Sequence, residues 1–510
     1  MIEPYPRGRN PFDETGVVRG ADGLARYADR PDSLVAMLEA SVERDPRASA
    51  IVEVAGAAVT YGELWERALR VAGGLRALGV APGDGVAIRL ANGIDWVLAF
   101  VGVQLLGAAA VPINTRFTDE EAEFVVSDSG ASFTFAPGAA LPDGDPVEPA
   151  LPGPDDLAAI FYTSGTTGFP KGAMTSHANF LTNSENAFRC LQTSRAEGPG
   201  ISTLVSVPLF HVTGCNSQLI PTLELGGRVE ILSGPLDFDG FFRAIGENGV
   251  NQLVSVPAIY HALVRHPRFA ELDVSRVRWV SYGGAPISES LVHTLEEAFP
   301  NARVGNGFGL TETASLSTFL PHEEAAAHAD SVGFAMPVVD LSLREADPQT
   351  GVGELLVRGP NVVQGYWQRP QETSETFAEG WLHTGDLARI DDEGLVYIVD
   401  RVKDMINRGG ENVYSLEVEN ALATAPGVGE AAVIAVPDEM MGEKVGAVLV
   451  PLAERGLDVE AVVAHCRARL ADFKVPQYVS VRAEPLPRNP GGKVLKRRLR
   501  DETAWGEPLR

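Results

Sequence analysis

The stretch DDLAAIFYTSGTTGFPKG, residues 155–172, joins a short apolar run to a loop rich in glycine and hydroxyl side chains. The apolar run predicts a buried strand, and the loop after it carries four Ser or Thr hydroxyls and one lysine, Lys171. Glycine-rich turns point backbone N–H groups into a concavity where they bind phosphate oxygens, and hydroxyls and a lysine add further donors. The loop is therefore predicted to hold phosphate, and the alternative is a flexible surface loop.

This loop differs from the phosphate loop of common NTPases. That motif needs a glycine before its lysine and a Ser or Thr after it. Here Pro170 precedes Lys171 and Gly172 follows it. The sequence thus predicts a phosphate-binding loop of another kind.

Bulk properties exclude several classes of protein. A chain of 510 residues is too long for one ordinary core, so two or more domains are expected. The formal net charge of −26 argues against nucleic acid as a partner. There is no run of about 18 apolar residues and no signal-peptide pattern, so no integral membrane segment is expected. The cysteines, which lie far apart without metal-ligand spacing, favour reduced thiols in a cytoplasmic protein: Cys190, Cys215 and Cys466.

The first 400 residues alternate strand-like and helix-like segments. Apolar runs such as GVAIRL (85–90) and AAAVPI (108–113) follow helical patterns such as YGELWERALRVAGGLRALG (61–79). This alternation predicts an α/β fold with mainly parallel sheets covered by helices. From residue 400 the pattern changes to a compact α+β unit of about a hundred residues. We therefore expect a large N-terminal domain over 1–399 and a small C-terminal domain over 400–510.

The stretch PRNPGGKVLKRRLR, residues 487–500, carries six basic residues and no acidic one in an otherwise acidic chain. It is either a solubilising tail or a segment that contributes a side chain to a functional site. Lys493 follows Gly491 and Gly492, a flexible approach that suits a side chain reaching into a site from another domain.

Two further loops end predicted strands, RWVSYGGAPIS (278–288) and NARVGNGFGLTETA (301–314). Ligands in α/β sheets sit beyond the carboxyl ends of strands, so these loops can converge with the phosphate loop. Phe308 offers a flat surface to a nucleobase, although a lone aromatic is more often part of the core. Glu312 suits Mg²⁺, which takes one or two carboxylates plus phosphate oxygens, and its alternative is a solvated surface position.

Two other polar residues stand in candidate loops. His211 in PLFHVTG (208–214) follows a predicted strand, and a lone histidine of this kind is usually structural. Asp386 in WLHTGDLARI (381–390) lies in a predicted turn, where a carboxylate can accept hydrogen bonds from two ribose hydroxyls.

Taken in order, these motifs resemble those of the adenylate-forming superfamily, which includes acyl-CoA synthetases, aryl-CoA ligases, beetle luciferases and peptide-synthetase adenylation domains. YTSGTTGFPKG looks like the family's phosphate-binding motif, GNGFGLTETA like its aromatic-Gly-x-Thr-Glu motif, and HTGD like its ribose-binding motif. DRVKDMINRGGENVYSLEVE (400–419) is similar to the hinge and thiol-entry motif, and PRNPGGKVLKRRLR to the motif of the catalytic lysine. The similarity runs over nearly the whole chain.

The resemblance implies two half-reactions on a large N-terminal domain with a mobile C-terminal lid. First, a carboxylic acid attacks the α-phosphate of MgATP, giving acyl-AMP and pyrophosphate. Then the lid rotates and a thiol, usually CoA, displaces AMP. ATP, Mg²⁺ and CoA are the implied cofactors and substrates.

For the nucleotide, the resemblance implies several groups of contacts. The β- and γ-phosphates would be held by Thr163, Ser164, Gly165, Thr166, Thr167, Gly168 and Lys171. Adenine would be framed by Gly284, Ala285, Pro286, Asn306, Gly307 and Phe308, and Gly309 would also belong to the nucleotide site. Ribose would contact Asp386 and Arg401, and the α-phosphate would contact Thr311. Mg²⁺ would lie beside Thr163 and Glu312.

For the chemistry, the resemblance implies that Lys493 bridges the carboxylate and the α-phosphate. Lys403 would be the hinge residue, and His211 an aromatic gate at the carboxylate. The thiol channel would comprise Arg408, Gly409, Gly410 and Lys444, although solvated surface positions suit Arg408 and Lys444 equally well. An apolar acyl or aryl acid is favoured by small, mostly apolar residues expected at the acyl pocket: Val212, Gly214, Cys215 and Val304.

The chain departs from the family pattern at few positions. Asp400 replaces the glycine often found before the hinge arginine, and Ser415 replaces the proline often found after Val-Tyr. Neither residue touches the chemistry directly. Asn306 and Phe308 stand where many relatives carry Gln or Glu and Tyr, which affects the details of adenine contact.

Three hypotheses concern the acceptor. An acid–CoA ligase is favoured, because the GGENVYS channel motif is present and no carrier-protein domain follows it. The alternative is a stand-alone adenylating enzyme that passes acyl-AMP to an acyl carrier protein or a nitrogen nucleophile. The third is a non-catalytic nucleotide or acyl-CoA sensor, which the intact Lys171, Glu312 and Lys493 disfavour. The chain length of the acid and the oligomeric state are left open.

Overall fold

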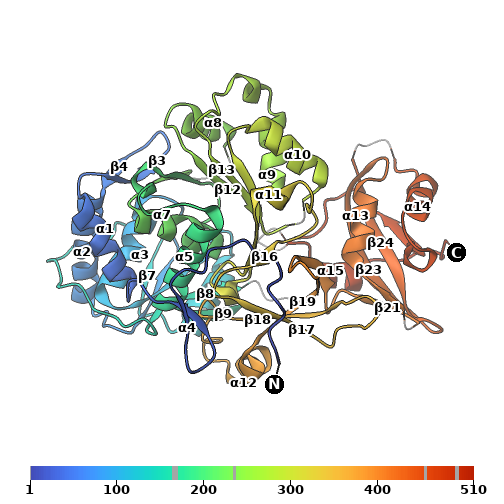
Figure 1. Cartoon of the computed structure of the whole chain (residues 1–510), viewed down its shortest axis with the longest axis horizontal. Helices are drawn as coiled ribbons and strands as arrows, with labels where there is room; N and C mark the ends of the chain where they lie inside the picture. The colour runs from blue at the N-terminus through green and yellow to red at the C-terminus, as the bar shows by residue number, and fades with distance from the viewer. Residues whose placement is uncertain are drawn as a thin grey trace.

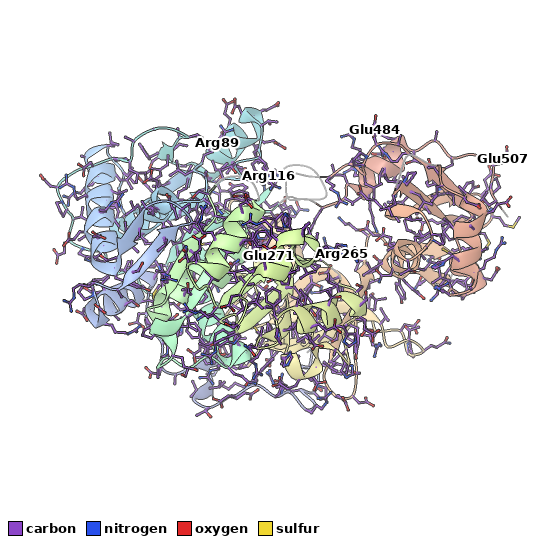
Figure 2. The ribbon with its side chains drawn as sticks, turned by 90° about the horizontal axis from the view of Figure 1, so that it is seen from above. Arg89, Arg116, Arg265, Glu271, Glu484 and Glu507 are labelled. Atoms are coloured by element: carbon purple, nitrogen blue, oxygen red, sulfur yellow. The ribbon has the colours of Figure 1, made fainter. Side chains whose placement is uncertain are left out.

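The computed structural model describes residues 2–163, 170–233, 237–285, 287–409, 411–452, 456–488 and 493–509. These residues form an N-terminal body of layered sheets and helices, with a smaller C-terminal lobe beside it (Figure 1). Seen from above, the lobe stands at one end of the body (Figure 2). The predicted α/β class, with a large N-terminal part and a small α+β part after it, is confirmed. The boundary between residues 399 and 400 stays a prediction; a strand of the body's sheet, Val396–Arg401, runs across it, and we assign Asp400 and Arg401 to the N-terminal body.

The largest sheet of the N-terminal body has nine strands, and its six inner strands are parallel. Inner strands such as β10 are buried along their whole length, which is why they appear in the sequence as continuous apolar runs. Across the sheet the order is β16 (Phe334–Ala335), β15 (Thr318–Leu320), β14 (Arg303–Phe308), β13 (Trp279–Gly283), β12 (Gln252–Ser255), β10 (Ser202–Val205), β11 (Arg228–Ile231), β3 (Ser49–Glu53) and β4 (Ala58–Thr60).

A five-stranded sheet carries the predicted phosphate loop. Its order is β7 (Phe133–Phe135), β5 (Gly85–Ile88), β6 (Ala109–Pro112), β8 (Leu157–Thr163) and β9 (Lys171–Ser176). β8 and β9 are antiparallel, and Thr163 at the end of β8 faces Lys171 at the start of β9. This register places two predicted phosphate ligands next to each other.

A four-stranded antiparallel sheet joins the body to the C-terminal lobe. It consists of β17 (Asp340–Arg344), β18 (Gly353–Arg358), β19 (Leu382–Ile390) and β20 (Val396–Arg401). The predicted turn around Asp386 is part of β19, whose Gly385 has a φ of +68°. An antiparallel ribbon of β1 (Val17–Arg19) and β2 (Ala25–Tyr27) precedes the layered part.

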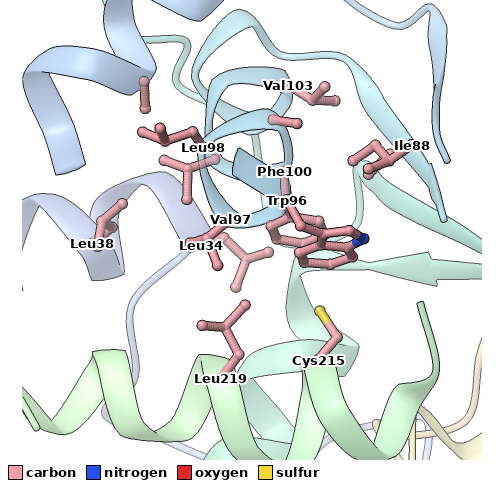
Figure 3. Close-up of a cluster of buried hydrophobic side chains, with 14 of the residues drawn as sticks. Leu34, Leu38, Ile88, Trp96, Val97, Leu98, Phe100, Val103, Cys215 and Leu219 are labelled. Atoms are coloured by element: carbon pink, nitrogen blue, oxygen red, sulfur yellow. The ribbon is translucent and has the colours of Figure 1, made fainter. Parts of the chain in front are cut away.

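Helices cover the sheets of the N-terminal body. α3 is buried almost all round, as expected of a helix that is apolar on every face. Figure 3 shows its Trp96 and Phe100 among the side chains of the surrounding core. The helices include α1 (Leu34–Arg44), α2 (Tyr61–Ala77), α3 (Ile94–Leu106), α4 (Asp119–Ser129), α5 (His177–Leu191), α6 (Val212–Gly214), α7 (Ile220–Leu225), α8 (Phe238–Gly246), α9 (Pro257–Arg265), α10 (Glu289–Ala298), α11 (His322–Ala325) and α12 (Pro370–Thr376).

The C-terminal lobe has a sheet and an apolar core of its own. The sheet runs β22 (Glu411–Val413), β21 (Ile406–Arg408), β24 (Gly442–Pro451) and β23 (Val428–Asp438), with β25 (Tyr478–Val481) paired to β24. Its helices are α13 (Ser415–Ala423), α14 (Val459–Arg467) and α15 (Lys496–Glu502). Across the described residues of the whole chain, the helices are all too short or too polar to cross a membrane.

Candidate active site

The carboxyl ends of β13 and β14 meet side by side in the nine-stranded sheet. Gly283 faces Gly307 in register, and a Cβ on Gly283 would lie only 2.3 Å from the carbonyl oxygen of Gly307. Gly284 follows with a φ of +74°, a conformation that favours glycine. Ligands bind at such strand ends in α/β folds, and four of the predicted adenine residues lie here: Gly284, Ala285, Gly307 and Phe308.

Asn306 is placed differently from these four residues. Its side chain is buried, and its Nδ2 donates to the carbonyl oxygen of Ser331 at 3.2 Å. One of the two N–H donors of this amide is therefore already used within the protein. Asn306 could therefore contact adenine only through the remaining polar groups of its side chain or through its backbone.

A tightly packed loop after β14 carries Thr311 and Glu312. A Cβ on Gly309 would lie 1.7 Å from the carbonyl oxygen of Ser315, so the two ends of the loop touch through their backbones. Thr311–Thr313 form a short 3₁₀ turn. Ala314 and Ser315 follow with φ values of 53° and 120°, which residues with a Cβ seldom adopt. Strained backbone of this kind is often found at functional sites.

Glu312 is held by a residue that the sequence did not reveal. The hydroxyl of Tyr366 donates to Oε1 of Glu312 at 2.6 Å, and burial together with this carboxylate raises the pKa of the phenol. The ammonium of Lys171 lies over the ring of the same tyrosine, 5.2 Å from its centroid. One aromatic side chain thus links the lysine beside the phosphate loop to the predicted magnesium ligand.

Asp386 and Arg401 form an ion pair across two neighbouring strands. They face each other in register on β19 and β20, and Nε of Arg401 donates to Oδ1 of Asp386 at 2.8 Å. The carboxylate is almost fully buried, and this burial raises its pKa although Arg401 and Lys493 act in the opposite direction. The two residues predicted at ribose are therefore neighbours, and the carboxylate depends on nearby cations.

Lys493 reaches this group from the C-terminal lobe. Burial and the charge of Arg401 lower its pKa, and the carboxylates of Asp386 and Glu312 partly oppose the shift. The side chain keeps contact with solvent although protein atoms surround it on most sides. A lysine of the C-terminal lobe is thus electrostatically coupled to three charged residues of the N-terminal body.

His211 belongs to the same electrostatic group. Crowding by the protein, and then the charge of Lys493, lower its pKa to about 4, although its ring remains accessible to solvent. Its Nδ1 accepts the backbone N–H of Thr213 at 3.3 Å, so the proton of the neutral ring lies on Nε2. The structure therefore presents a neutral imidazole close to Lys493.

The predicted hinge follows β20 directly. Lys403 is exposed, yet crowding lowers its pKa to about 8, with Asp404 acting against the shift and Arg401 and Lys493 adding to it. Three cationic side chains, Arg401, Lys403 and Lys493, therefore lie close together around the carboxylate of Asp386. This concentration of positive charge suits a polyanionic ligand.

Three of the predicted thiol-channel residues are among the described residues, and all three lie in the C-terminal lobe: Arg408, Gly409 and Lys444. Figure 1 shows α15 next to the N-terminal body, and β21 ends at Arg408. Arg408 pairs with Glu411 at 3.5 Å and Lys444 with Asp438 at 2.7 Å. Gly409 has a φ of +63°, and its N–H donates to the carbonyl oxygen of Met441.

The predicted acyl-pocket residues do not share one cluster. Cys215 is fully buried, and Figure 3 shows it facing the core with Trp96 and Leu219. Val212 belongs to the same cluster, whereas Val304 is buried in a separate one. A Cβ on Gly214 would lie 2.3 Å from the carbonyl oxygen of Pro208, so this glycine allows close backbone packing.

Some predicted site residues lie outside the described part of the chain: Ser164, Gly165, Thr166, Thr167, Gly168, Pro286 and Gly410. A cavity of about 230 Å³ beside Arg7 and Asp340 contains none of the predicted site residues in its lining.

Two family models match this chain. Residues 38–367 match the model of AMP-binding enzymes, and residues 417–493 match that of the AMP-binding enzyme C-terminal domain. A feruloyl-CoA synthase of Amycolatopsis sp is 37% identical over 479 residues, covering 89% of this chain and 96% of that protein. The long-chain-fatty-acid–CoA ligase FadD13 of Mycobacterium tuberculosis is 36% identical over 501 residues, covering 91% and 97%.

Solved structures give the same relationship. The o-succinylbenzoate CoA synthetase of Bacillus subtilis, in complex with its acyl-adenylate intermediate, superposes with a TM-score of 0.83 at 28% identity, covering 92% of this chain and 99% of that one. A Mycobacterium tuberculosis fatty acyl CoA synthetase gives a TM-score of 0.73 at 33% identity, covering 92% and 98%. The chain therefore belongs to the AMP-binding enzyme family, and within it to the acyl-CoA synthetases.

Proposed function

We propose that this chain activates an apolar carboxylic acid with MgATP and then transfers the acyl group to CoA. The observation that carries the proposal is the coupling of Lys493, from the C-terminal lobe, to Asp386, Arg401 and Glu312 of the N-terminal body. The site contains residues of both the N-terminal body and the C-terminal lobe. Such a site fits a reaction in which the C-terminal lobe moves between the first and the second step. We place this reaction in the cytoplasm, where the three buried free cysteines stay reduced.

In the first step, a carboxylate oxygen of the acid attacks the α-phosphorus, and the bond to the bridging oxygen of pyrophosphate breaks. Two anions must approach each other, so an ammonium group between them stabilises the transition state. Lys493 is the group proposed for this role. Protein atoms that surround its ammonium on most sides screen the charge less than bulk water does, so the charge acts more strongly on the phosphate and the carboxylate.

Around the reacting atoms, other residues would hold the nucleotide. Arg401 occupies Oδ1 of Asp386, and we assign Oδ2 to the ribose hydroxyls. Lys171 and Thr163, neighbours across β8 and β9, would contact the outer phosphates, and Thr311 the α-phosphate. The neutral ring of His211 would close the site beside the carboxylate.

The donors present fit Mg²⁺ bound together with ATP. The described residues contain no cluster of three His, Cys, Asp or Glu side chains that would hold an ion alone. Glu312, oriented by Tyr366, offers one carboxylate, and phosphate oxygens supply the other ligands that Mg²⁺ usually takes. A solved o-succinylbenzoate CoA synthetase, 29% identical, contains ATP and a magnesium ion.

In the second step, the sulfur of CoA attacks the acyl carbon, and the bond to the phosphate oxygen breaks to release AMP. We propose that the C-terminal lobe turns about Lys403 to bring Arg408, Gly409, Gly410 and Lys444 to the thiol. In the present arrangement Lys493 is coupled to Asp386, Arg401 and Glu312, as expected before this rotation.

Incubation with MgATP, a panel of acids and either CoA or hydroxylamine tests the proposal. An acid–CoA ligase releases AMP in a CoA-dependent manner and forms an acyl-CoA that mass spectrometry detects. Hydroxamate formation that is indifferent to CoA would point instead to transfer onto a carrier protein or an amine. Absence of AMP under both conditions, with every acid, would contradict the proposed activity.

A further inference from the structure

A buried hydrogen-bonded group spans the predicted hinge. Asp400 lies in β20, which pairs with β19 in the four-stranded sheet of the N-terminal body. Ser415 is the first residue of α13 in the C-terminal lobe. The carboxylate of Asp400 accepts both the backbone N–H and the hydroxyl of Ser415, the latter at 2.9 Å. One side chain of the body therefore holds the start of a helix of the lobe.

Lys496 extends this group toward the catalytic segment. Its ammonium donates to the hydroxyl oxygen of Ser415 at 2.7 Å and pairs with Oε1 of Glu419 at 2.8 Å. Lys496 begins α15, three residues after Lys493. The position of Lys493 is thus linked through α15 to Ser415, and through Ser415 to the sheet that carries Asp386 and Arg401.

The members of this group are shielded from water. Asp400 is 4% exposed and Ser415 is fully buried. Burial raises the pKa of Asp400, and Lys496, Ser415 and the N–H of Arg401 act against this shift. The carboxylate therefore relies on these partners, and a buried charge that loses a partner is costly.

Two of the departures from the family pattern, Asp400 and Ser415, contact each other here. Ser415 stands where a proline is often found, and proline has neither the N–H nor the hydroxyl that Asp400 accepts. A glycine at position 400 would offer no acceptor side chain. The two substitutions together create contacts that neither could make alone.

We propose that Asp400, Ser415 and Lys496 form a latch across the hinge that positions Lys493 for acyl-AMP formation. They are positioning residues, and none of them touches the reacting atoms. The inference rests on the proposed function, because it assigns the latch to the first of the two half-reactions. Turning the lobe about Lys403 separates Asp400 from Ser415, so the latch must break before thioester formation.

The substitution Ser415→Pro tests the latch directly. Ser415 occupies the first position of α13, where proline is well tolerated, so the variant removes both hydrogen bonds without breaking the helix. Charge-assisted hydrogen bonds of this kind lead us to expect a fall in acyl-AMP formation of about tenfold or more. Transfer from preformed acyl-AMP to CoA should proceed at the parent rate or faster. ATP–pyrophosphate exchange and single-turnover transfer measure the two steps.

A matched control is Lys474→Met. Glu417 lies on α13, as Ser415 does, and it pairs with the ammonium of Lys474 at 2.7 Å. Both members of this pair belong to the C-terminal lobe, so the pair does not cross the hinge. This variant should leave both half-reactions unchanged. Ser415→Ala, which keeps the N–H, should give a smaller loss in exchange than Ser415→Pro and serves if the proline variant fails to fold.

Trypsin digestion gives a second measurement that does not depend on activity. Arg401 and Lys403 are cleavage sites in the hinge, and an unlatched lobe should expose them, so Ser415→Ala should be cut there faster than Lys474→Met. Equal loss of both half-reactions, or unchanged exchange and unchanged cleavage, would overturn the latch. A parent enzyme that forms no acyl-AMP with any acid would instead overturn the proposed function.

Discussion

Lys493 is surrounded by charges of both signs, and its pKa follows from their balance. Burial and Arg401 lower the pKa, so the ammonium is easier to deprotonate than an ordinary lysine until an anion joins it. Bound ATP brings negative charge and should restore the protonated form. The cation is thus set to interact most strongly when substrate is present.

This balance predicts a pH dependence that differs between free and bound enzyme. The protonated amine is the active form, and burial lowers the pKa of Lys493, so kcat/KM for ATP should decline at a lower pH than the titration of an ordinary lysine would give. The kcat at saturating ATP should persist to higher pH, because the bound anion raises the pKa of Lys493. ATP–pyrophosphate exchange measured across pH 7 to about 10 checks this. A kcat/KM for ATP that stays constant over this range would contradict the lowered pKa.

Tyr366 provides a second prediction at the scale of one residue. Tyr366→Phe keeps the ring beneath Lys171 but removes the hydrogen bond to Glu312. Hydrogen bonds to charged groups contribute about 1.5–3 kcal/mol, so the KM for MgATP should rise by about tenfold or more. Tyr366→Leu also removes the ring and should cost more. A phenylalanine variant with the parent KM would show that Glu312 needs no such support.

At the scale of elements, the sequence predicts the strands well and their long-range contacts poorly. The apolar runs at 85–90 and 108–113 become β5 and β6, because both strands are largely buried in a parallel sheet. Glycines and hydroxyls mark the site loops, since backbone approach and phosphate binding need them locally. Tyr366 lies 54 positions from Glu312, and no local pattern signals such a pair.

The same reason applies to Asp400 and Ser415. Each residue is visible in the sequence as a departure from a family pattern, but nothing in the sequence says that the two side chains meet. Their contact depends on how α13 packs against β20. Cys215 shows the converse case, since a residue near a site motif faces the core.

A substitution at Gly309 tests whether close backbone packing holds the loop that carries Glu312 in place. Gly309→Ala would force a Cβ against the backbone of Ser315 and displace the loop, so acyl-AMP formation should fall by a factor of about 10² or more. Gly200→Ala is the matched control, because its Cβ would meet no described atom within 4 Å and should leave activity unchanged. Exchange assays on both variants, with thermal melts to confirm folding, decide the matter. Full activity in Gly309→Ala would mean that the loop can shift freely.

The hinge gives a further prediction at this scale. Lys403→Pro fixes φ at one residue of the turn between β20 and β21, so acyl-AMP formation should continue while thioester formation stops. Lys403→Ala, which keeps the backbone free, should retain both steps. Quenched-flow measurement of acyl-AMP and acyl-CoA separates them, and normal thioester turnover in the proline variant would show that Lys403 is not the pivot.

At the scale of the whole molecule, the two parts of the chain share polar contacts but no apolar core. The buried clusters of the described residues lie either before Arg401 or after Met405, and none includes residues from both sides. Hydrogen bonds and ion pairs can be exchanged for water, whereas a shared core would have to be exposed. The C-terminal lobe can therefore turn as a unit and keep its own stability.

One ammonium group, that of Lys493 in the C-terminal lobe, is proposed to serve the first half-reaction and to be absent from the second. Measuring both half-reactions of Lys493→Ala tests this most directly. Acyl-AMP formation should fall by a factor of about 10²–10³ or more, because the variant loses the charge between two anions. Transfer of the acyl group from added acyl-AMP to CoA should remain close to the parent rate. Equal loss of both half-reactions, or parent-like acyl-AMP formation, would contradict the claim.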